Sequence, residues 1–109
     1  MFILVYIHLE SSKEDYDWYR SDQWTKEAID KKIKAVLAKD WKTVGGAYGT
    51  AETVILYKTM HLYRNKIKGK RALVVGSESP WVESLLLALG AKHVTTLEYN
   101  SIKSTHPQV

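Results

Sequence analysis

Apolar residues gather in four parts of the chain: at its start, along two long helical patterns, and in one strand–helix–strand unit near its end. Residues 1–9 are almost wholly apolar and rich in Ile, Val, Phe and Tyr, which favours a strand over a helix at that length. Residues 10–22 are acidic and polar, so we expect a surface loop there. The chain therefore begins with a predicted buried strand or hydrophobic arm.

The first helical pattern is predicted to start near residues 21–25 and to run to about residue 39. Asp22 or Thr25 is the expected N-cap, since either side chain can accept a hydrogen bond from a free N–H of the first turn. The apolar positions at helical spacing are Trp24, Ile29, Ile33, Val36 and Leu37. Three glycines in five residues follow, and we interpret residues 43–50 as an internal linker or flexible loop.

A second helix is predicted over about residues 51–66, with Thr50 as its N-cap. One apolar side is formed by Val54, Tyr57, Met60 (or His61) and Ile67, and it is widened by Ile55, Leu62 and Tyr63. Gly69 ends this helix or lies just beyond it, because glycine tolerates the positive φ that often follows a helix.

Residues 70–100 carry the unit around which the rest of the chain is organised. Residues 72–75 are a short apolar run, typical of a strand buried on both faces. A helix follows and ends at Gly90, and residues 94–99 alternate as a second strand. The tail, residues 101–109, is polar and brings no further strand.

The turn between the first strand and this helix begins at Gly76. Ser79 is the expected N-cap of the helix, and Pro80 its first residue. Proline is tolerated there because the N–H at the first helical position makes no hydrogen bond within the helix. Trp81 shares a helical face with Leu85, so we expect it to pack in the core rather than against a ligand.

The order of these segments predicts an α/β fold. Residues 1–66 are predicted to form an N-terminal strand or arm with two helices, and residues 67–109 the first β-α-β unit of a Rossmann-like domain. The two strands of this unit should lie parallel and be joined by a right-handed crossover. A doubly wound domain usually has about five or more strands, so we expect a small variant or a truncated fragment of a longer product.

The glycine turn argues against a dinucleotide ligand. The dinucleotide fingerprint is G-x-G-x-x-G, and here only Gly76 is present, while Glu78 stands where the second glycine would approach a pyrophosphate. A carboxylate repels phosphate, but S-adenosylmethionine has no phosphate and bears a positive sulfonium. Glu98 ends the second strand at a spacing typical of an acid that binds ribose hydroxyls, although a solvent-facing glutamate is the alternative.

Four short motifs carry a resemblance to a known family: VVGS at 74–77, PWVE at 80–83, LGA at 89–91 and TLEYN at 96–100. In these the chain resembles a nematode (Caenorhabditis-type) family known as a domain of unknown function. That family is in turn similar to S-adenosylmethionine-dependent methyltransferases. The resemblance implies a fold, and it implies cofactor use by analogy.

By that analogy Gly76 would approach the methionine moiety of S-adenosylmethionine, and Ser77 would hydrogen-bond its carboxylate. Glu98 would hold the ribose, with Tyr99 or Asn100 beside the adenine. No catalytic residue is identifiable, and the chain stops before the strands that supply substrate contacts in methyltransferases. We therefore expect it not to be catalytically competent alone. The alternative function is a non-catalytic α/β scaffold or partner-binding module.

Composition adds limits to this interpretation. The chain has 109 residues, enough for one domain, and a formal net charge of +4. Its lysines gather in residues 30–42 and 64–71, mostly on polar faces of predicted helices, which favours a solvated surface over nucleic-acid binding. The apolar start is shorter than the about 20 residues that a membrane-spanning helix needs. We expect a cytoplasmic protein by default.

Metal and thiol chemistry are not expected. The chain has no cysteine, which excludes disulfides and a thiol nucleophile. The histidines, at positions 8, 61, 93 and 106, form no closely spaced pair of the kind that zinc sites show. A strand pair with an open edge in so short a chain also predicts self-association.

Overall fold

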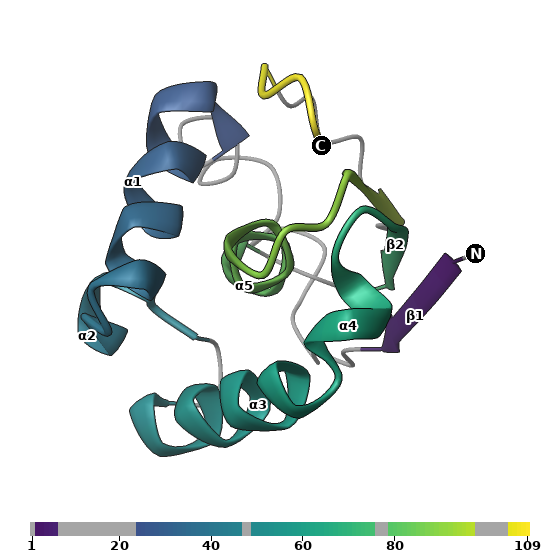
Figure 1. The fold of residues 1–109 in the computed structure, drawn as a ribbon. Coiled ribbons are helices and arrows are strands. Elements are labelled where there is room, and N and C mark those ends of the chain that lie inside the picture. Colours follow the sequence, from purple (N-terminus) through teal and green to yellow (C-terminus); the bar gives the residue numbers. More distant parts are fainter. Residues whose placement is uncertain (1, 7–23, 47–48, 76–78, 98–104) are drawn as a thin grey trace.

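The computed structural model describes residues 2–6, 24–46, 49–75, 79–97 and 105–109. Its described part is mixed α/β, as predicted, and Figure 1 shows its helices on one side of a small sheet. In chain order the elements are β1 (Phe2–Tyr6), α1 (Lys26–Leu37), α2 (Trp41–Val44), α3 (Thr50–Leu62), α4 (Arg64–Ile67), β2 (Arg71–Val75), α5 (Trp81–Ala88) and β3 (His93–Leu97). None of the helices in these ranges is long and apolar enough to cross a membrane.

The sheet has three parallel strands in the order β1-β2-β3. Strands β2 and β3 are consecutive in the sheet and are linked by α5, so the predicted parallel strand–helix–strand arrangement is confirmed. The predicted N-terminal strand pairs with the other side of β2, from Phe2 opposite Arg71 to Tyr6 opposite Val75. One sheet therefore joins the first residues of the chain to its last third.

Helix α5 occupies the centre of the core, with α1 packed on it and α3 along another side (Figure 1). Ala72 and Val74 of β2 and Val94 of β3 are fully buried on the face that α5 covers. The buried residues form one cluster drawn from α1 to β3: Ala35, Val36, Val44, Met60, Ile67, Ala72, Val74, Trp81, Val82, Leu85, Leu86, Ala91 and Val94. The prediction that Trp81 packs in the core is confirmed.

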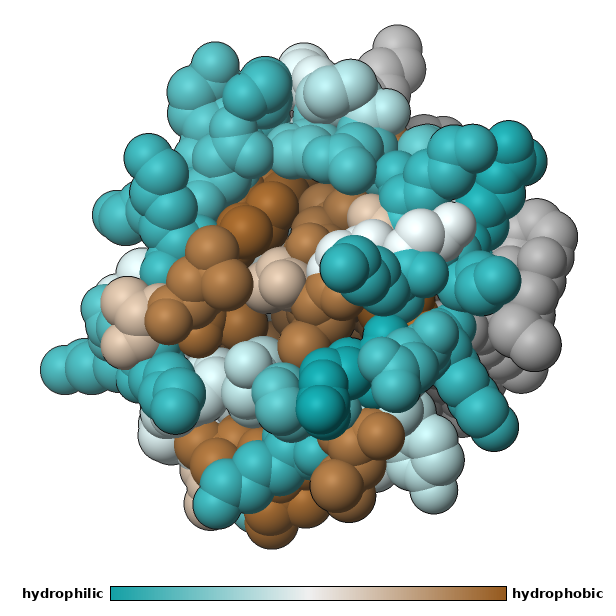
Figure 2. Space-filling view, in the orientation of Figure 1, coloured by the Kyte–Doolittle hydropathy of each residue, from teal (hydrophilic) through white to brown (hydrophobic). Residues whose placement is uncertain are grey.

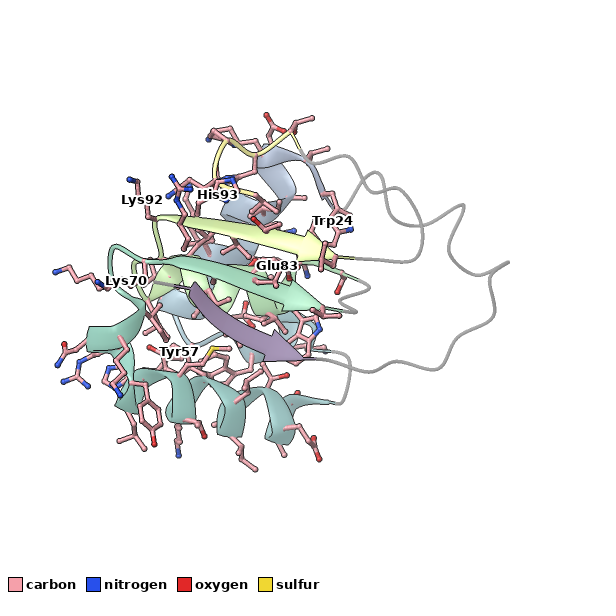
Figure 3. All side chains as sticks on the ribbon, turned by 90° about the vertical axis from the view of Figure 1, so that its right-hand side faces the viewer. Trp24, Tyr57, Lys70, Glu83, Lys92 and His93 are labelled. Carbon is pink, nitrogen blue, oxygen red and sulfur yellow. The ribbon has the colours of Figure 1, made fainter. Side chains whose placement is uncertain are left out.

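The opposite face of the sheet has a different surface. Side chains alternate along a strand, so the residues between the buried ones point away from α5. We call these the open face: Arg71, Leu73 and Val75 of β2, and His93, Thr95 and Leu97 of β3. Figure 3 looks at this face, and within the described residues no helix lies in front of the strands. None of the six is buried, although parallel sheets are usually covered on both faces.

Helix α1 begins as predicted and ends earlier. Thr25 is its N-cap, and its hydroxyl accepts a hydrogen bond from the Ala28 N–H at 3.1 Å. Ile29 and Val36 are buried, but Leu37 is 65% exposed, so its assignment to the apolar face is wrong. The helix ends at Leu37 and turns through Lys39, whose φ is +60°.

The predicted linker at residues 43–50 is partly wrong. Residues 41–44 form α2, capped by Asp40, and Val44 is fully buried in the core. Gly45 ends this helix with φ +68°, and the ammonium of Lys32 donates to the Val44 carbonyl at 2.9 Å. Burial lowers the pKa of Lys32, and the neighbouring Lys31 lowers it further. The start of the supposed linker is thus anchored to the core through Val44.

The predicted second helix is divided in two. Helix α3 ends at Leu62 and α4 follows at Arg64–Ile67, with Gly49 rather than Thr50 at the N-cap of α3. Met60 and Ile67 are buried as expected. The residues expected to widen the apolar side are exposed instead: Ile55, Leu62 and Tyr63. Figure 2 shows apolar surface over α3, and a second, hollowed apolar area over α5 beside α1.

The end of the chain packs against α1 and β3. The Val94 N–H donates to the Gln108 carbonyl at 2.7 Å, and the Thr105 N–H donates to the Trp24 carbonyl at 3.1 Å. The prediction that this tail adds no strand agrees with residues 105–109, which form only turns. The first of these bonds satisfies one backbone N–H on the outer edge of β3.

Candidate functional site

The carboxyl ends of the three strands meet at one edge of the sheet. Tyr6, Val75 and Leu97 are register partners at the last position of β1, β2 and β3. Ligands of parallel α/β sheets bind at this edge, just beyond the strand ends. The sequence predicts a cofactor site at this edge of the sheet. Three parallel strands of five residues each end there.

The predicted cofactor-binding residues follow directly from these strand ends. Gly76 and Ser77 come after Val75, while Glu98 and Tyr99 come after Leu97. All four lie outside the described residues, as do Glu78 and Asn100. The last described residues before them, Val75 and Leu97, are register partners and therefore lie side by side.

Helix α5 begins close to this edge. It starts at Trp81 with Pro80 at the N-cap position, so the prediction of Ser79 as N-cap and Pro80 as first helical residue is wrong by one residue. The Trp81 N–H donates to the Ser79 carbonyl at 2.8 Å. The buried hydroxyl of Ser84 donates to the Pro80 carbonyl at 2.6 Å, which ties the first turn together.

A buried acid lies in the same first turn, and sequence reasoning assigned it no role in a site. Glu83 is fully buried, and its carboxylate accepts a hydrogen bond from the Thr96 hydroxyl at 2.6 Å. Thr96 is one residue before the end of β3, so Glu83 connects the start of α5 to the carboxyl edge of the sheet (Figure 3). The sequence did carry a signal for this burial: Glu83 lies three residues before Leu86 and therefore on the same face of the helix.

Three segments meet tightly at the start of α5. A Cβ added to Gly46 would lie 1.7 Å from the Thr53 hydroxyl and 3.2 Å from the Trp81 ring. Thr53 is fully buried, and its hydroxyl donates to the Gly49 carbonyl at 2.7 Å. Only glycine fits at position 46, so the loop after α2 packs directly against α3 and α5.

A second cluster of polar groups lies beside the N-terminal half of α1. His106 is buried, with Nε2 2.9 Å from the Asp30 carboxylate, and its Nδ1 accepts from the Gln108 N–H at 3.1 Å. The acceptor role of Nδ1 places the ring proton on Nε2, which donates to Asp30. Hydrogen bonds from Lys26 and then His106 lower the pKa of Asp30 below its usual range. This cluster holds the C-terminal residues against α1.

The amino ends of β2 and β3 are basic. Arg71, Lys92, His93 and Thr95 line a shallow hollow of about 400 Å³ there. Figure 3 shows Lys70, Lys92 and His93 at the end of the sheet opposite Glu83. Within the described residues, no three His, Cys, Asp or Glu side chains come together as metal ligands would.

Comparisons with protein-family models, with curated proteins and with solved structures found no match to this chain. The resemblance to the nematode family and to methyltransferases therefore stays a prediction from the motifs.

Proposed function

We propose that this chain is a Rossmann-like, methyltransferase-like unit that binds S-adenosylmethionine at the carboxyl edge of its parallel sheet. One observation carries the proposal: Val75 and Leu97 are register partners at the ends of β2 and β3. A glycine and an acid follow them in the sequence, Gly76 and Glu98. In α/β nucleotide-binding folds, residues of these types at these strand ends approach the ligand and hold its ribose.

The buried first turn of α5 supports the same site. Glu83 and Thr96 fix the helix start against β3, and Ser84 closes the first turn on Pro80. A ligand edge requires such rigid supports, because positions that shift by an ångström lose much of their binding energy. No group in this arrangement is assigned to methyl transfer, and we expect the chain alone to bind without catalysing.

The test is thermal unfolding with and without S-adenosylmethionine. A ligand bound with micromolar affinity should stabilise the folded chain by about 4 kcal/mol at millimolar concentration, which appears as a clear rise in Tm. Glu98→Ala should abolish the rise, and the control Glu52→Ala, an exposed residue in the first turn of α3, should keep it. An unchanged Tm at millimolar ligand would instead favour the non-catalytic scaffold or partner-binding module.

A further inference from the structure

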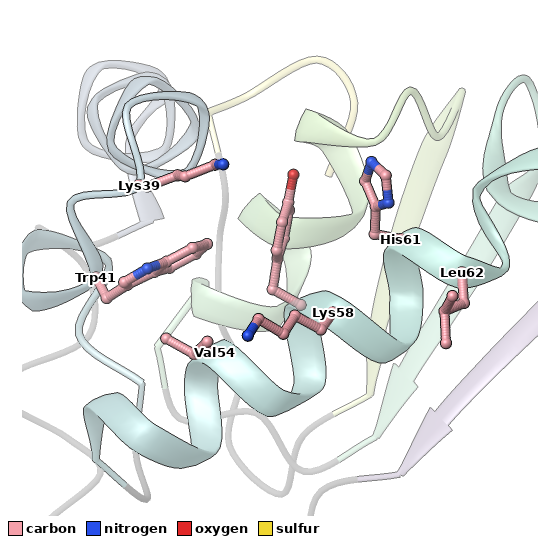
Figure 4. Close-up of a pocket in the computed structure, with 7 residues that line it drawn as sticks. Lys39, Trp41, Val54, Lys58, His61 and Leu62 are labelled. Atoms are coloured by element: carbon pink, nitrogen blue, oxygen red, sulfur yellow. The ribbon is translucent and has the colours of Figure 1, made fainter.

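A groove of about 700 Å³ lies between α3 and the segment that joins α1 to α2. Its size falls within the range of about 300–1,000 Å³ that small-molecule sites occupy. The residues lining it are Lys39, Trp41, Val54, Tyr57, Lys58, His61 and Leu62. Figure 4 shows Lys39 and Trp41 on one side, facing the α3 residues on the other.

Three aromatic rings follow one another along the groove. The ring centroids of Trp41 and Tyr57 are 5.0 Å apart, and those of Tyr57 and His61 are 5.9 Å apart. Trp41 and Tyr57 are half-buried and pack against the hydrophobic core, so each keeps part of its ring accessible while the rest is held in place. Fixed, partly exposed rings are the surfaces on which nucleobases stack.

The position of Trp41 is set by the cap of its own helix. Asp40 precedes it, and the Asp40 carboxylate accepts from the Thr43 hydroxyl at 2.6 Å and from the Thr43 N–H at 3.4 Å. Trp41 is the first residue of α2 and is therefore fixed by these bonds before any ligand arrives.

Positive charge surrounds the rings. Lys39 and Lys58 line the groove, and none of the described residues that line it is acidic. The Arg64 guanidinium donates to the His61 carbonyl at 2.9 Å and lies 3.4 Å from His61 Nδ1. A guanidinium only donates, so Nδ1 is the acceptor and Nε2 carries the ring hydrogen. The groove thus offers cations and a donor beside its aromatic surfaces.

Lys39 occupies a position where glycine would be more stable. Its φ is +60°, directly after the last residues of α1, and the Asp40 N–H donates to the Ala35 carbonyl at 2.8 Å. This is the left-handed helix end at which glycine is strongly preferred, because a Cβ is strained there. Strained residues concentrate at functional sites, and here the strained residue contributes an ammonium group to the groove.

We propose that this groove binds a nucleotide, with its base against Trp41 and Tyr57 and its phosphate between Lys39 and Lys58. Free nucleotides and nucleotides within a single strand share this chemistry, namely a planar heteroaromatic ring joined to an anion. The groove is separate from the proposed S-adenosylmethionine site, and its ligand differs in charge, since S-adenosylmethionine carries no phosphate.

The test is isothermal titration of the full chain with AMP, with adenosine and with oligothymidylates of increasing length, at low salt. We expect AMP to bind at least tenfold more tightly than adenosine. Affinity that rises further with oligonucleotide length identifies single-stranded nucleic acid as the source, and affinity that does not rise identifies the free nucleotide. The absence of binding by both AMP and oligonucleotides at millimolar concentration overturns the proposal.

Two variants make the test specific. Lys39→Gly should weaken AMP at least fivefold and also raise Tm by a few degrees, because it removes a contact and relieves the strained backbone. Lys58→Ala should weaken AMP to a similar extent, and Lys34→Ala, an exposed lysine outside the groove, should not. Unchanged AMP affinity in both groove variants overturns the proposal. Retained AMP binding in Glu98→Ala separates this groove from the carboxyl-edge site.

Discussion

The two faces of the sheet have the same backbone and opposite surroundings. On the covered face, Ala72, Val74 and Val94 are fully buried beneath α5. On the open face, Leu73 and Val75 are only partly buried and Leu97 is 51% exposed. The open face also carries the polar Arg71, His93 and Thr95, and within the described residues no helix packs on it, whereas α5 packs on the covered face. Within the part of the chain that the structure describes, the buried core therefore lies on one face of the sheet.

Two neighbouring threonines show the same difference at the level of single groups. The Thr96 hydroxyl donates to buried Glu83, whereas Thr95 is exposed on the open face. The covered face thus includes a polar contact that must be satisfied, because a buried carboxylate that loses a donor is destabilising. The exposed Thr95 hydroxyl can hydrogen-bond to water and needs no partner within the protein. Matched substitutions on the two faces can measure how much each face contributes to the free energy of unfolding.

The largest expected effect comes from a matched pair of leucines. Leu86→Ala removes a fully buried side chain from α5 and should lower the free energy of unfolding by about 2–5 kcal/mol. Leu97→Ala, on the open face, should change it by about 0.5 kcal/mol or less, since surface substitutions rarely do more. Urea unfolding followed by circular dichroism measures both. Equal losses would mean that the open face is packed in solution.

The pair of threonines should differ less. Thr96→Val keeps the shape but removes the donor to Glu83, and it should cost about 1–3 kcal/mol. Thr95→Val should be neutral or slightly stabilising, because valine suits an exposed strand position as well as threonine does. The same urea titration compares the two variants. A neutral Thr96→Val would show that the carboxylate is satisfied without this hydroxyl.

The smallest effect depends on pH and concerns α1, the helix that packs on α5. The pKa of Asp30 is lowered mainly by its hydrogen bond from Lys26 and then by His106. Its contribution to stability is therefore present above its unfolded pKa of about 3.9 and is lost as pH falls through the lower folded pKa. Asp30→Asn should be less stable than the unaltered chain near neutral pH, and the difference should vanish in strong acid. Urea midpoints measured from pH 6 downward test this, and a difference independent of pH would contradict it.

Local patterns predicted the covered side of the fold well. Thr25 was one of two expected caps, Trp81 was expected in the core, and the parallel strands around α5 followed from a strand–glycine–helix–strand order. The errors share a cause. Leu37 and Leu62 fit a helical stripe, but whether such a stripe is covered depends on neighbours that are distant in the sequence. Gly45 and Gly46 suggested a flexible linker, although one ends a helix and the other allows close packing.

The candidate site was only partly predictable. The sequence pointed to the carboxyl edge through Gly76 and Glu98, and strand pairing places the ends of β2 and β3 side by side before them. Glu83 entered the sequence analysis only as part of the PWVE motif, because spacing alone does not reveal its contact with Thr96. The groove near Tyr57 joins residues of α2 and α3 with Lys39 from the turn between α1 and α2. An argument from the composition of lysine-rich runs does not show that these residues lie together.

The pairing of β1 with β2 has a consequence for how the chain folds. Phe2 meets Arg71 about 70 residues along the chain, whereas Arg71 and His93 are about 20 residues apart. Closing the longer loop costs more entropy, and distant pairings slow folding. We therefore expect β2, α5 and β3 to assemble first and β1 to dock last. In native-state hydrogen exchange the amides of β1 should open at lower free energy than those of β2 and β3, and uniform protection across the sheet would refute this order.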